Sequence, residues 1–250
     1  MNLEQSIDEA IKLIKKSKHA VAFTGAGISV ESGIPPFRGP GGIWEKYDPT
    51  LFDIGFFLEH PKKSWELIRK IFFESFGDAK PHAAHTVLAA LEKRGTLKAI
   101  ITQNIDNLHQ SAGSTRVIQF HGNSNYFICI DCNKKYELDY ITFDKLPPVC
   151  EVCGGILKPD FVFFGEPIPQ QAHIDSMYEA EHSDLLILVG TTGIIMPASL
   201  IPFVAKRNGA KIIEINPNKS QYTDEIVDIF LQGKAKVVFE KIAAKMKLDA

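Results

Sequence analysis

The sequence has no long apolar run, little net charge and few cysteines, and each shortage excludes a class of protein. No apolar run approaches the roughly 20 residues that cross a bilayer, so no membrane partner is expected. The 28 lysines and arginines nearly balance the 30 aspartates and glutamates, and a net charge of −2 gives no bulk attraction to nucleic acid. Residues 1–6 lack the basic and apolar parts of a secretory signal, which favours a cytoplasmic location. Four cysteines in such a protein are not expected to form disulfides.

Strand patterns and helix patterns alternate along most of the 250 residues. Apolar runs typical of strands are Ala20–Phe23, Ala99–Thr102, Val117–Phe120, Phe161–Phe164, Leu185–Val189 and Lys211–Ile215. Helical patterns occupy a first stretch from Leu3 that ends among lysines up to Lys18, and then 83–93, 170–181, 198–208 and 237–246. Buried strands alternating with helices predict an α/β fold with a Rossmann-like parallel sheet and helices on both faces.

Two regions interrupt this alternation. Residues 32–81 are rich in proline, glycine and aromatic residues, with one or two helical pieces, and residues 124–157 hold all four cysteines. We expect these regions to form a smaller helical and zinc-binding domain. The Rossmann-like domain would then consist of residues 1–31, 82–123 and 158–250.

The cysteines form a C-x2-C-x17-C-x2-C array. Its members are Cys129, Cys132, Cys150 and Cys153. Four thiolates complete a tetrahedral zinc site and leave no open position for water, so we predict one structural Zn²⁺. The alternative is a zinc ribbon that binds nucleic acid, but Asp131, Asp144 and Glu151 are among five acidic residues in this region that would repel phosphates.

Polar or small residues follow several of the predicted strands. The turn Gly25-Ala26-Gly27 comes after the first strand and before a potentially helical stretch, which is typical of a phosphate-binding turn, although the third glycine of the standard fingerprint is missing. Later strand ends carry Gln103 to Asp106, His121, Gly190 to Thr192, and Asn216 to Asn218. Any single strand-ending turn tends to be rich in such residues. Together they predict a dinucleotide site at the carboxyl edge of the sheet.

Two histidines lie in these polar segments. His121 follows an apolar strand and precedes a glycine, a position where imidazole can act as a general base near neutral pH. His109 lies beside Leu108 at a helix start, and we interpret it as structural.

In this order, the motifs resemble those of the sirtuins, the NAD-dependent protein-lysine deacylases. The matching segments are Gly25 to Ser29, Glu31 to Pro35, Phe37 to Gly39, Thr102 to Asp106, Leu108-His109, Ala112-Gly113, Phe120 to Asn123, the four cysteines, Phe163 to Glu166 and Gly190 to Thr192. The resemblance covers nearly the whole chain and implies NAD and one zinc ion as cofactors.

The resemblance also implies roles for residues. In the NAD site, Gly25, Ala26 and Gly27 would cradle the pyrophosphate, and the loop through Phe37 and Arg38 would close over the cofactor. Gln103 would lie near the reactive ribose, with Asn104, Ile105 and Asp106 around the nicotinamide. The adenosine half would contact Gly190, Thr191, Thr192, Asn216, Pro217, Asn218 and Ala235.

For catalysis, the resemblance assigns Asn104 and His121, with His121 deprotonating a ribose hydroxyl so that the acyl group passes to ADP-ribose. The acylated peptide would contact Val162, Phe163, Gly165, Glu166 and Ile195. A glycine at position 193 would loosen the loop beside the peptide.

The acyl group is predicted to be neutral. Succinyl-selective sirtuins carry a Tyr-x-x-Arg pair, and no tyrosine occurs between Asp48 and Asn125 here. Arg69 is the nearby cation that could change this preference.

We therefore expect an NAD-dependent protein-lysine deacetylase acting on acetylated proteins. The alternatives are a mono-ADP-ribosyltransferase, a deacylase preferring longer aliphatic acyl groups, and a non-enzymatic NAD-sensing adaptor. The joint presence of His121, Asn104 and Asp106 argues against the adaptor, because binding alone needs no base.

Overall fold

A six-stranded parallel sheet forms the centre of the larger part of the molecule. The computed structural model describes residues 2–74 and 78–248. The strands are β1 (Ala20–Thr24), β2 (Leu97–Thr102), β3 (Val117–Gln119), β7 (Leu185–Val189), β8 (Lys211–Asn216) and β9 (Ile229–Gln232). Their order is β3-β2-β1-β7-β8-β9, and every neighbouring pair is parallel. The chain therefore proceeds in opposite directions from β1 and from β7, which creates a switch point between these two strands.

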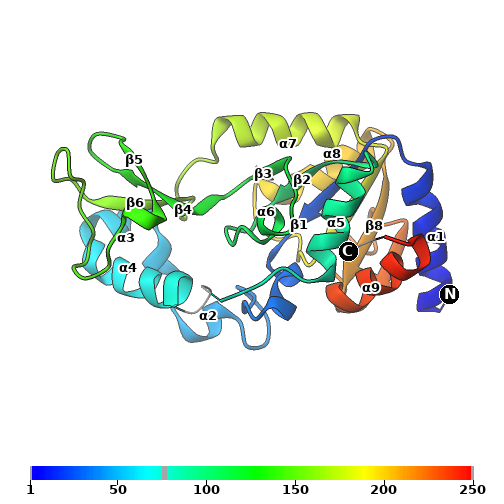
Figure 1. Cartoon of the computed structure of the whole chain (residues 1–250), viewed down its shortest axis with the longest axis horizontal. Helices are drawn as coiled ribbons and strands as arrows, with labels where there is room; N and C mark the ends of the chain where they lie inside the picture. Colours follow the sequence, from blue (N-terminus) through cyan, green and yellow to red (C-terminus); the bar gives the residue numbers. More distant parts are fainter. Residues whose placement is uncertain (1, 75–77, 249–250) are drawn as a thin grey trace.

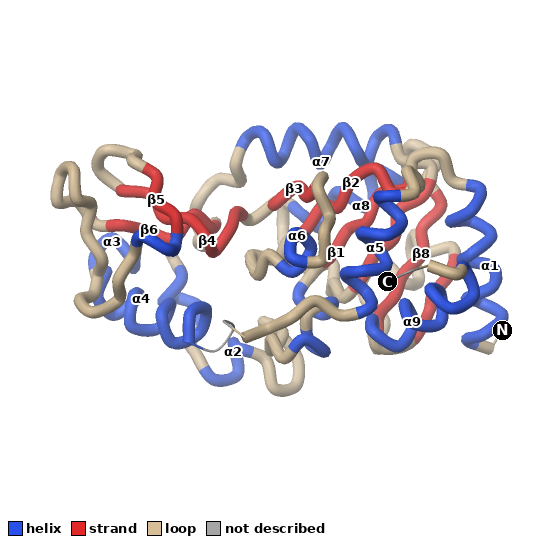
Figure 2. The backbone as a smooth tube through the Cα atoms, in the orientation of Figure 1, coloured by secondary structure: helices blue, strands red, loops and turns tan. Residues whose placement is uncertain are grey.

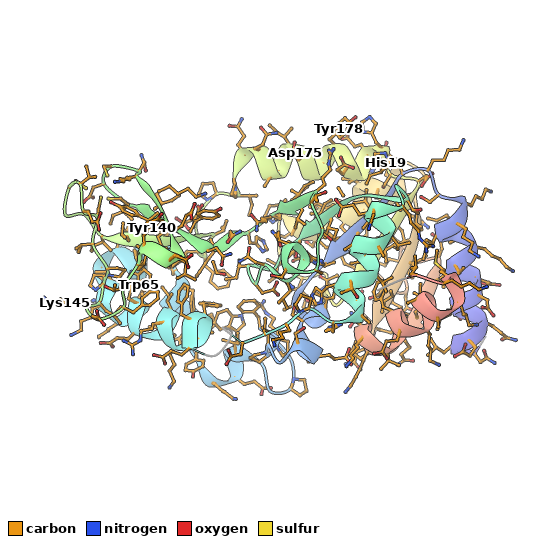
Figure 3. The ribbon with its side chains drawn as sticks, in the orientation of Figure 1. His19, Trp65, Tyr140, Lys145, Asp175 and Tyr178 are labelled. Atoms are coloured by element: carbon orange, nitrogen blue, oxygen red, sulfur yellow. The ribbon has the colours of Figure 1, made fainter. Side chains whose placement is uncertain are left out.

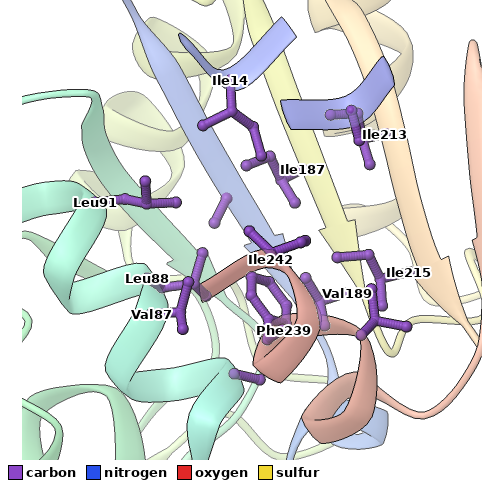
Figure 4. Close-up of a cluster of buried hydrophobic side chains, with 14 of the residues drawn as sticks. Ile14, Val87, Leu88, Leu91, Ile187, Val189, Ile213, Ile215, Phe239 and Ile242 are labelled. Carbon is purple, nitrogen blue, oxygen red and sulfur yellow. The ribbon is translucent and has the colours of Figure 1, made fainter. Parts of the chain in front are cut away.

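Helices cover both faces of this sheet, as the Rossmann-like prediction required (Figure 1). On one face, α1 (Leu3–Lys16), α5 (Ala83–Lys93) and α9 (Ala235–Met246) bury the cluster shown in Figure 4. On the other face, α7 (Gln170–His182) and α8 (Ile201–Arg207) pack on a second cluster. Strand β1 contributes Ala20 and Ala22 to the first cluster and Val21 and Phe23 to the second. Burial on both faces explains why this strand is continuously apolar.

A smaller antiparallel sheet lies at the opposite end of the molecule from α1 and α9 (Figure 2). Its order is β5-β4-β6, with β4 at Gly122–Cys129, β5 at Lys135–Glu137 and β6 at Leu157–Phe161. Short helices pack near it: α2 (Ile43–Lys46), α3 (Ile54–Glu59), α4 (Pro61–Ile68) and a π-helical turn at Arg69–Glu74.

The cores of the cysteine-containing region and the helical region are one aromatic cluster. Trp65 of α4 is fully buried, and its ring stacks on Phe127 of β4 at a centroid distance of 5.8 Å. The Trp65 indole N–H donates to the carbonyl of Leu157 at 2.8 Å. Figure 3 shows Trp65 inside this smaller unit. The two interrupting regions of the sequence therefore pack on each other.

Short helical turns complete the chain. They are α6 at Leu108–Ser111 and 3-10 turns at Ala26–Ile28, Val30–Ser32, Pro49–Phe52, Leu138–Tyr140 and Ala198–Leu200. Among the described helices, none combines the length and apolar character needed to cross a bilayer.

Several predictions of local structure were wrong. The run Phe161–Phe164 is not a parallel strand, because β6 ends at Phe161 and pairs antiparallel with β4. No α-helix follows Gly27, because two 3-10 turns lead into Gly33, whose φ of 94° ends the helical path. The helical stretch predicted at 198–208 is confirmed, and it consists of a 3-10 turn at Ala198–Leu200 followed by α8. Strand β9 was not predicted.

Candidate active site and metal centre

One cavity of about 680 Å³ lies at the carboxyl ends of β1, β2, β7 and β8. The predicted residues that line it are Gly25, Ala26, Gly27, Phe37, Arg38, Gln103, Asn104, Ile105, His121, Val162, Phe163, Gly165, Glu166, Gly190, Thr191, Thr192, Ile195, Asn216, Pro217, Asn218 and Ala235. They come from segments far apart in the sequence, and these segments adjoin strands of both sheets. The exception among the described residues is Asp106, which does not line the cavity.

The turns after β1 and β7 touch backbone to backbone. The Gly27 N–H donates to the Gly190 carbonyl at 2.9 Å. A Cβ added to Gly27 would lie 2.6 Å from the Gly190 Cα, and one added to Gly190 would lie 2.3 Å from the Ile28 nitrogen. Gly190 also has a φ of 61°, which favours glycine. Close approach of two chain segments therefore requires these glycines, independently of any ligand.

Asn104 and Asp106 are linked through Ser29. The Asn104 amide nitrogen donates to the Gly25 carbonyl at 3.2 Å and lies 3.3 Å from the Ser29 hydroxyl oxygen. That hydroxyl donates to Asp106 Oδ2 at 2.6 Å, and the Leu108 N–H donates to Oδ1 at 3.0 Å. Burial raises the pKa of the Asp106 carboxyl, and these donors oppose the rise. In this structure, Asp106 thus fixes the turn that carries Asn104, and a direct contact with nicotinamide stays a prediction.

A buried hydroxyl pair supports the end of β2. The Asn104 N–H donates to Thr102 Oγ1 at 3.1 Å, and the Thr24 hydroxyl donates to the same oxygen at 2.9 Å. Because the hydroxyl proton of Thr24 is used in this hydrogen bond, the Thr24 oxygen accepts a hydrogen bond from His109 Nε2 at 3.0 Å. His109 is 1% exposed, and burial lowers its pKa to about 3. A neutral, buried His109 agrees with its interpretation as a structural residue.

His121 has the geometry of a general base. Its Nδ1 lies 3.0 Å from the Gln103 carbonyl oxygen, which can only accept, so Nδ1 carries the proton and Nε2 carries the lone pair. Burial lowers the imidazole pKa, and the bond to Gln103 only partly offsets this effect. The ring is therefore neutral at pH 7 and can take a proton at Nε2.

The chain around Val162 joins His121 to the smaller unit. The Val162 N–H donates to the His121 carbonyl at 2.9 Å. Two residues later, the Phe164 N–H donates to the Phe52 carbonyl at 2.9 Å, and the Ile54 N–H donates to the Phe164 carbonyl at 3.0 Å. This segment thus forms one wall of the cavity between the two sheets.

The structure bears on two expectations about the acyl and peptide region, which concern Gly193 and Arg69. Gly193 has a φ of 78°, and an added Cβ would lie 2.9 Å from the Tyr222 ring, so the position requires glycine. That this glycine loosens the loop stays a prediction. Arg69 pairs with Glu74 at 2.7 Å and donates to the Phe143 carbonyl, in a separate hollow that Lys145 also lines. Among the described residues lining the active-site cavity, the cations are Arg38, Lys219 and Lys234.

The four cysteines form a second candidate site. Their Sγ atoms all lie within 4.8 Å of one another, with 3.4 Å between Cys129 and Cys153 and 3.6 Å between Cys132 and Cys150. A tetrahedral zinc ion with Zn–S bonds of about 2.3 Å places its sulfurs about 3.8 Å apart. The cluster therefore fits one zinc ion with four thiolate ligands. The Tyr136 hydroxyl lies 3.1 Å from Cys150 Sγ and accepts from the Glu151 N–H.

Sequence reasoning missed the supporting residues of the cavity. Ser29 was noted only as part of a motif, and Thr24, Thr102 and Lys158 were not singled out for this purpose. The roles of Ser29, Thr24 and Thr102 depend on contacts between residues 77 to 85 positions apart, and the role of Lys158 depends on the path of a turn. Local sequence carries no signal for these contacts.

Comparison with known proteins gives one consistent family. Residues 25–197 match the model of the Sir2 family. The chain is 42% identical over 243 residues to an NAD-dependent protein deacetylase 1 of Pyrobaculum aerophilum, covering 96% of this chain and 95% of the relative. It is 43% identical over 250 residues to an NAD-dependent protein deacylase 2 of Archaeoglobus fulgidus, covering 98% of each. A solved structure described as Sir2-p53 peptide-NAD+ superposes with a TM-score of 0.90 at 34% identity, covering 96% of this chain and 98% of that one.

Proposed function

Because this chain belongs to the Sir2 family, we propose that it is an NAD-dependent protein-lysine deacetylase that produces nicotinamide, free lysine and O-acetyl-ADP-ribose. Its substrates are acetylated proteins, and it uses NAD with one structural zinc ion. We further propose a cytoplasmic location, no binding to nucleic acid, and a boundary between large and small domains near residues 31, 81, 123 and 157.

The glycine turn, Arg38 and the ends of β7 and β8 would hold the cofactor. The Arg38 guanidinium suits a pyrophosphate. The Gly25 and Gly27 N–H groups already donate to the Val189 and Gly190 carbonyls, so the turn would contribute close backbone approach rather than these two donors. Amides and hydroxyls of Thr191, Asn216 and their neighbours suit ribose and adenine. When bound, NAD supplies a ribose that loses nicotinamide and accepts the acyl group. Asn104 is held by Gly25 and Ser29, where it can orient the nicotinamide end.

His121 would move the proton that the reaction requires. Its Nε2 lone pair accepts the proton of a ribose hydroxyl, while Nδ1–H remains bonded to the Gln103 carbonyl. The Gln103 contact fixes both the tautomer and the ring orientation, as a general base needs. The neutral, Nδ1-protonated His121 at the wall of the cavity is the observation that carries the proposal beyond family membership.

The walls of the cavity favour a neutral acyl group. Aromatic and aliphatic residues such as Phe72, Ile105 and Phe161 line it, and Arg69 is engaged elsewhere. A succinyl carboxylate would be desolvated without a partner. Turnover of acetyl-lysine peptide is therefore expected to be at least about tenfold more efficient than turnover of succinyl-lysine peptide, because about 1.4 kcal/mol gives that ratio.

The test is incubation of the protein with NAD and matched acetyl-, butyryl-, octanoyl- and succinyl-lysine peptides. Mass spectrometry then measures nicotinamide, free lysine peptide and O-acyl-ADP-ribose. Equal formation of all three with the acetyl peptide supports the deacetylase. ADP-ribose attached to protein would indicate a mono-ADP-ribosyltransferase instead. A higher kcat/KM for the octanoyl peptide would indicate a long-chain deacylase, and comparable values for succinyl and acetyl would exclude the neutral-acyl preference.

A further inference from the structure

Lys158 is a largely buried cation beside the proposed peptide wall, and sequence reasoning gave it no role. Its side chain is 12% exposed. The Nζ atom donates to the carbonyls of Pro159 at 2.9 Å and Phe161 at 2.8 Å, and to Glu166 Oε2 at 3.0 Å. These three acceptors match the three N–H donors of an ammonium group. The ammonium also lies 4.3 Å from the centre of the Phe163 ring.

Glu166 closes the turn around this cation. Its Oε2 accepts a second hydrogen bond, from the Phe163 N–H at 2.8 Å, and its own N–H donates to the Phe163 carbonyl at 3.0 Å. Gly165, with a φ of 86°, allows the chain to turn between them. The backbone from Phe161 to Glu166 is therefore hydrogen-bonded to both side chains of the Lys158–Glu166 ion pair.

The charge of this pair is maintained by its surroundings. Burial lowers the pKa of Lys158, and the carboxylates of Glu166 and Asp160 oppose the change. Loss of either partner would leave the other charge poorly solvated, which is costlier than losing an exposed pair. The Lys158–Glu166 ion pair therefore stabilises one conformation of the backbone from Phe161 to Glu166.

The same backbone forms the cavity wall. Val162, Phe163, Gly165 and Glu166 line the cavity, and Val162 is hydrogen-bonded to the His121 carbonyl. A shift in this turn would therefore move the peptide wall relative to the base. The turn at Gly25 to Gly27 on the cofactor side does not depend on this segment, because contact with Gly190 fixes that turn.

We propose that Lys158 and Glu166 are positioning residues for the acylated peptide, which they orient by fixing the backbone from Phe161 to Glu166. The inference rests on the proposed deacetylase function and assigns the Glu166 side chain a role different from direct contact with substrate. It predicts a selective effect on peptide binding, with the cofactor half of the site unchanged.

The first experiment measures kinetics of Lys158→Met and Glu166→Gln. Met keeps much of the apolar stem of lysine, and Gln keeps an oxygen that can accept from Phe163. We expect the KM for an acetyl-lysine peptide to rise at least about tenfold in both variants, since small displacements of a binding wall have large kinetic effects. The KM for NAD should change by less than about twofold. Zinc content should stay the same.

Lys135→Met is the matched control. Lys135 pairs with Asp160 at 2.8 Å in the same small sheet, but it is 52% exposed and does not line the cavity within the described chain. This variant should keep the parent KM for peptide. An unchanged peptide KM in both Lys158→Met and Glu166→Gln would overturn the proposal. So would an equal rise in Lys135→Met, or a parallel loss of NAD affinity.

A second experiment does not depend on turnover. Amide hydrogen exchange in residues 161–166, read by mass spectrometry, should be faster in Glu166→Gln than in the parent and unchanged in Lys135→Met. Unchanged exchange in Glu166→Gln would contradict the role of the pair even if Lys158→Met failed to fold. If the unmodified protein turns over no acetyl peptide, the deacetylase proposal fails, while this exchange experiment still decides whether the pair holds the turn.

Discussion

Among single residues, His121 connects the structure most directly to a reaction. Its Nδ1 proton is committed to the Gln103 carbonyl, so Nε2 is the nitrogen available to a substrate hydroxyl. His121→Ala should lower kcat by about 10²–10⁴-fold, the usual contribution of a positioned base. NAD should still bind, because the glycine turn and the ends of β7 and β8 are untouched. Single-turnover kinetics and NAD titration check both parts, and near-normal deacetylation would refute the assignment.

The pKa of His121 also fixes the direction of the pH dependence. Burial lowers this pKa below the ordinary value of about 6.5, and the base works only when neutral. The acid limb of kcat/KM should therefore have its midpoint below about pH 6.5. A midpoint well above this value would show that a different group limits the reaction.

At the scale of elements, the zinc-binding turns depend on more than their four thiolates. The Tyr136 hydroxyl accepts from the Glu151 N–H, so its own proton points to Cys150 Sγ, 3.1 Å away. A donor of this kind orients a thiolate ligand and stabilises its charge. Tyr136 lies in β5, and it thus ties the small sheet to the second cysteine turn.

We expect Tyr136→Phe to release zinc to a colorimetric chelator about tenfold faster than the parent, at the lower end of effects seen for such supporting residues. Cys150→Ala should lose the metal and unfold the smaller unit. Tyr140→Phe serves as the control, because Tyr140 lies in the same region and is 75% exposed. Equal release from Tyr136→Phe and the parent would contradict the role of the hydroxyl, and purified protein without zinc would contradict the metal site itself.

The elements that sequence predicted well are those with a regular hydrophobic pattern. Strand β7 at Leu185–Val189 and helix α5 at Ala83–Lys93 have the predicted bounds, because each has a continuous apolar or helical pattern. Strand β6 alternates buried and half-buried residues and contains Pro159, so its pairing in a separate antiparallel sheet was not predicted. Strand β9 has only four residues and one buried side, which gives little signal.

The sequence predicted which residues line the candidate site, but it did not predict the contacts that hold them in place. Strand ends identified Gln103, His121 and Thr191 because parallel strands bring their carboxyl ends to one edge. The tautomer of His121, the engagement of Asp106 by Ser29, and the pairing of Lys158 with Glu166 depend on the folded path of the chain. Gly193 shows the same limit, since its glycine is required by the distant Tyr222 ring.

At the scale of the whole molecule, two buried histidines link stability to pH. The rings of His85 in α5 and His109 in α6 are 5.1 Å apart, and burial is the main cause that lowers their pKa values to about 2 and about 3. Both are fully neutral in the folded protein near pH 5, whereas in the unfolded chain they bind protons below about pH 6.5. The unfolded state therefore takes up more protons on acidification.

Consequently, the free energy of unfolding should fall as the pH drops from about 6.5 toward 4, by up to about 1.4 kcal/mol per pH unit for each histidine. Above pH 6.5 these two groups should contribute no slope. Urea unfolding at pH 7, 6 and 5 measures the effect. His109→Gln keeps a side-chain donor for Thr24 but cannot titrate, so its stability should depend less steeply on pH than that of the parent. His182→Gln, a substitution at the exposed end of α7, should keep the parent slope, because it leaves both buried histidines in place. Identical slopes for His109→Gln and the parent would show that His109 does not resist protonation in the folded protein.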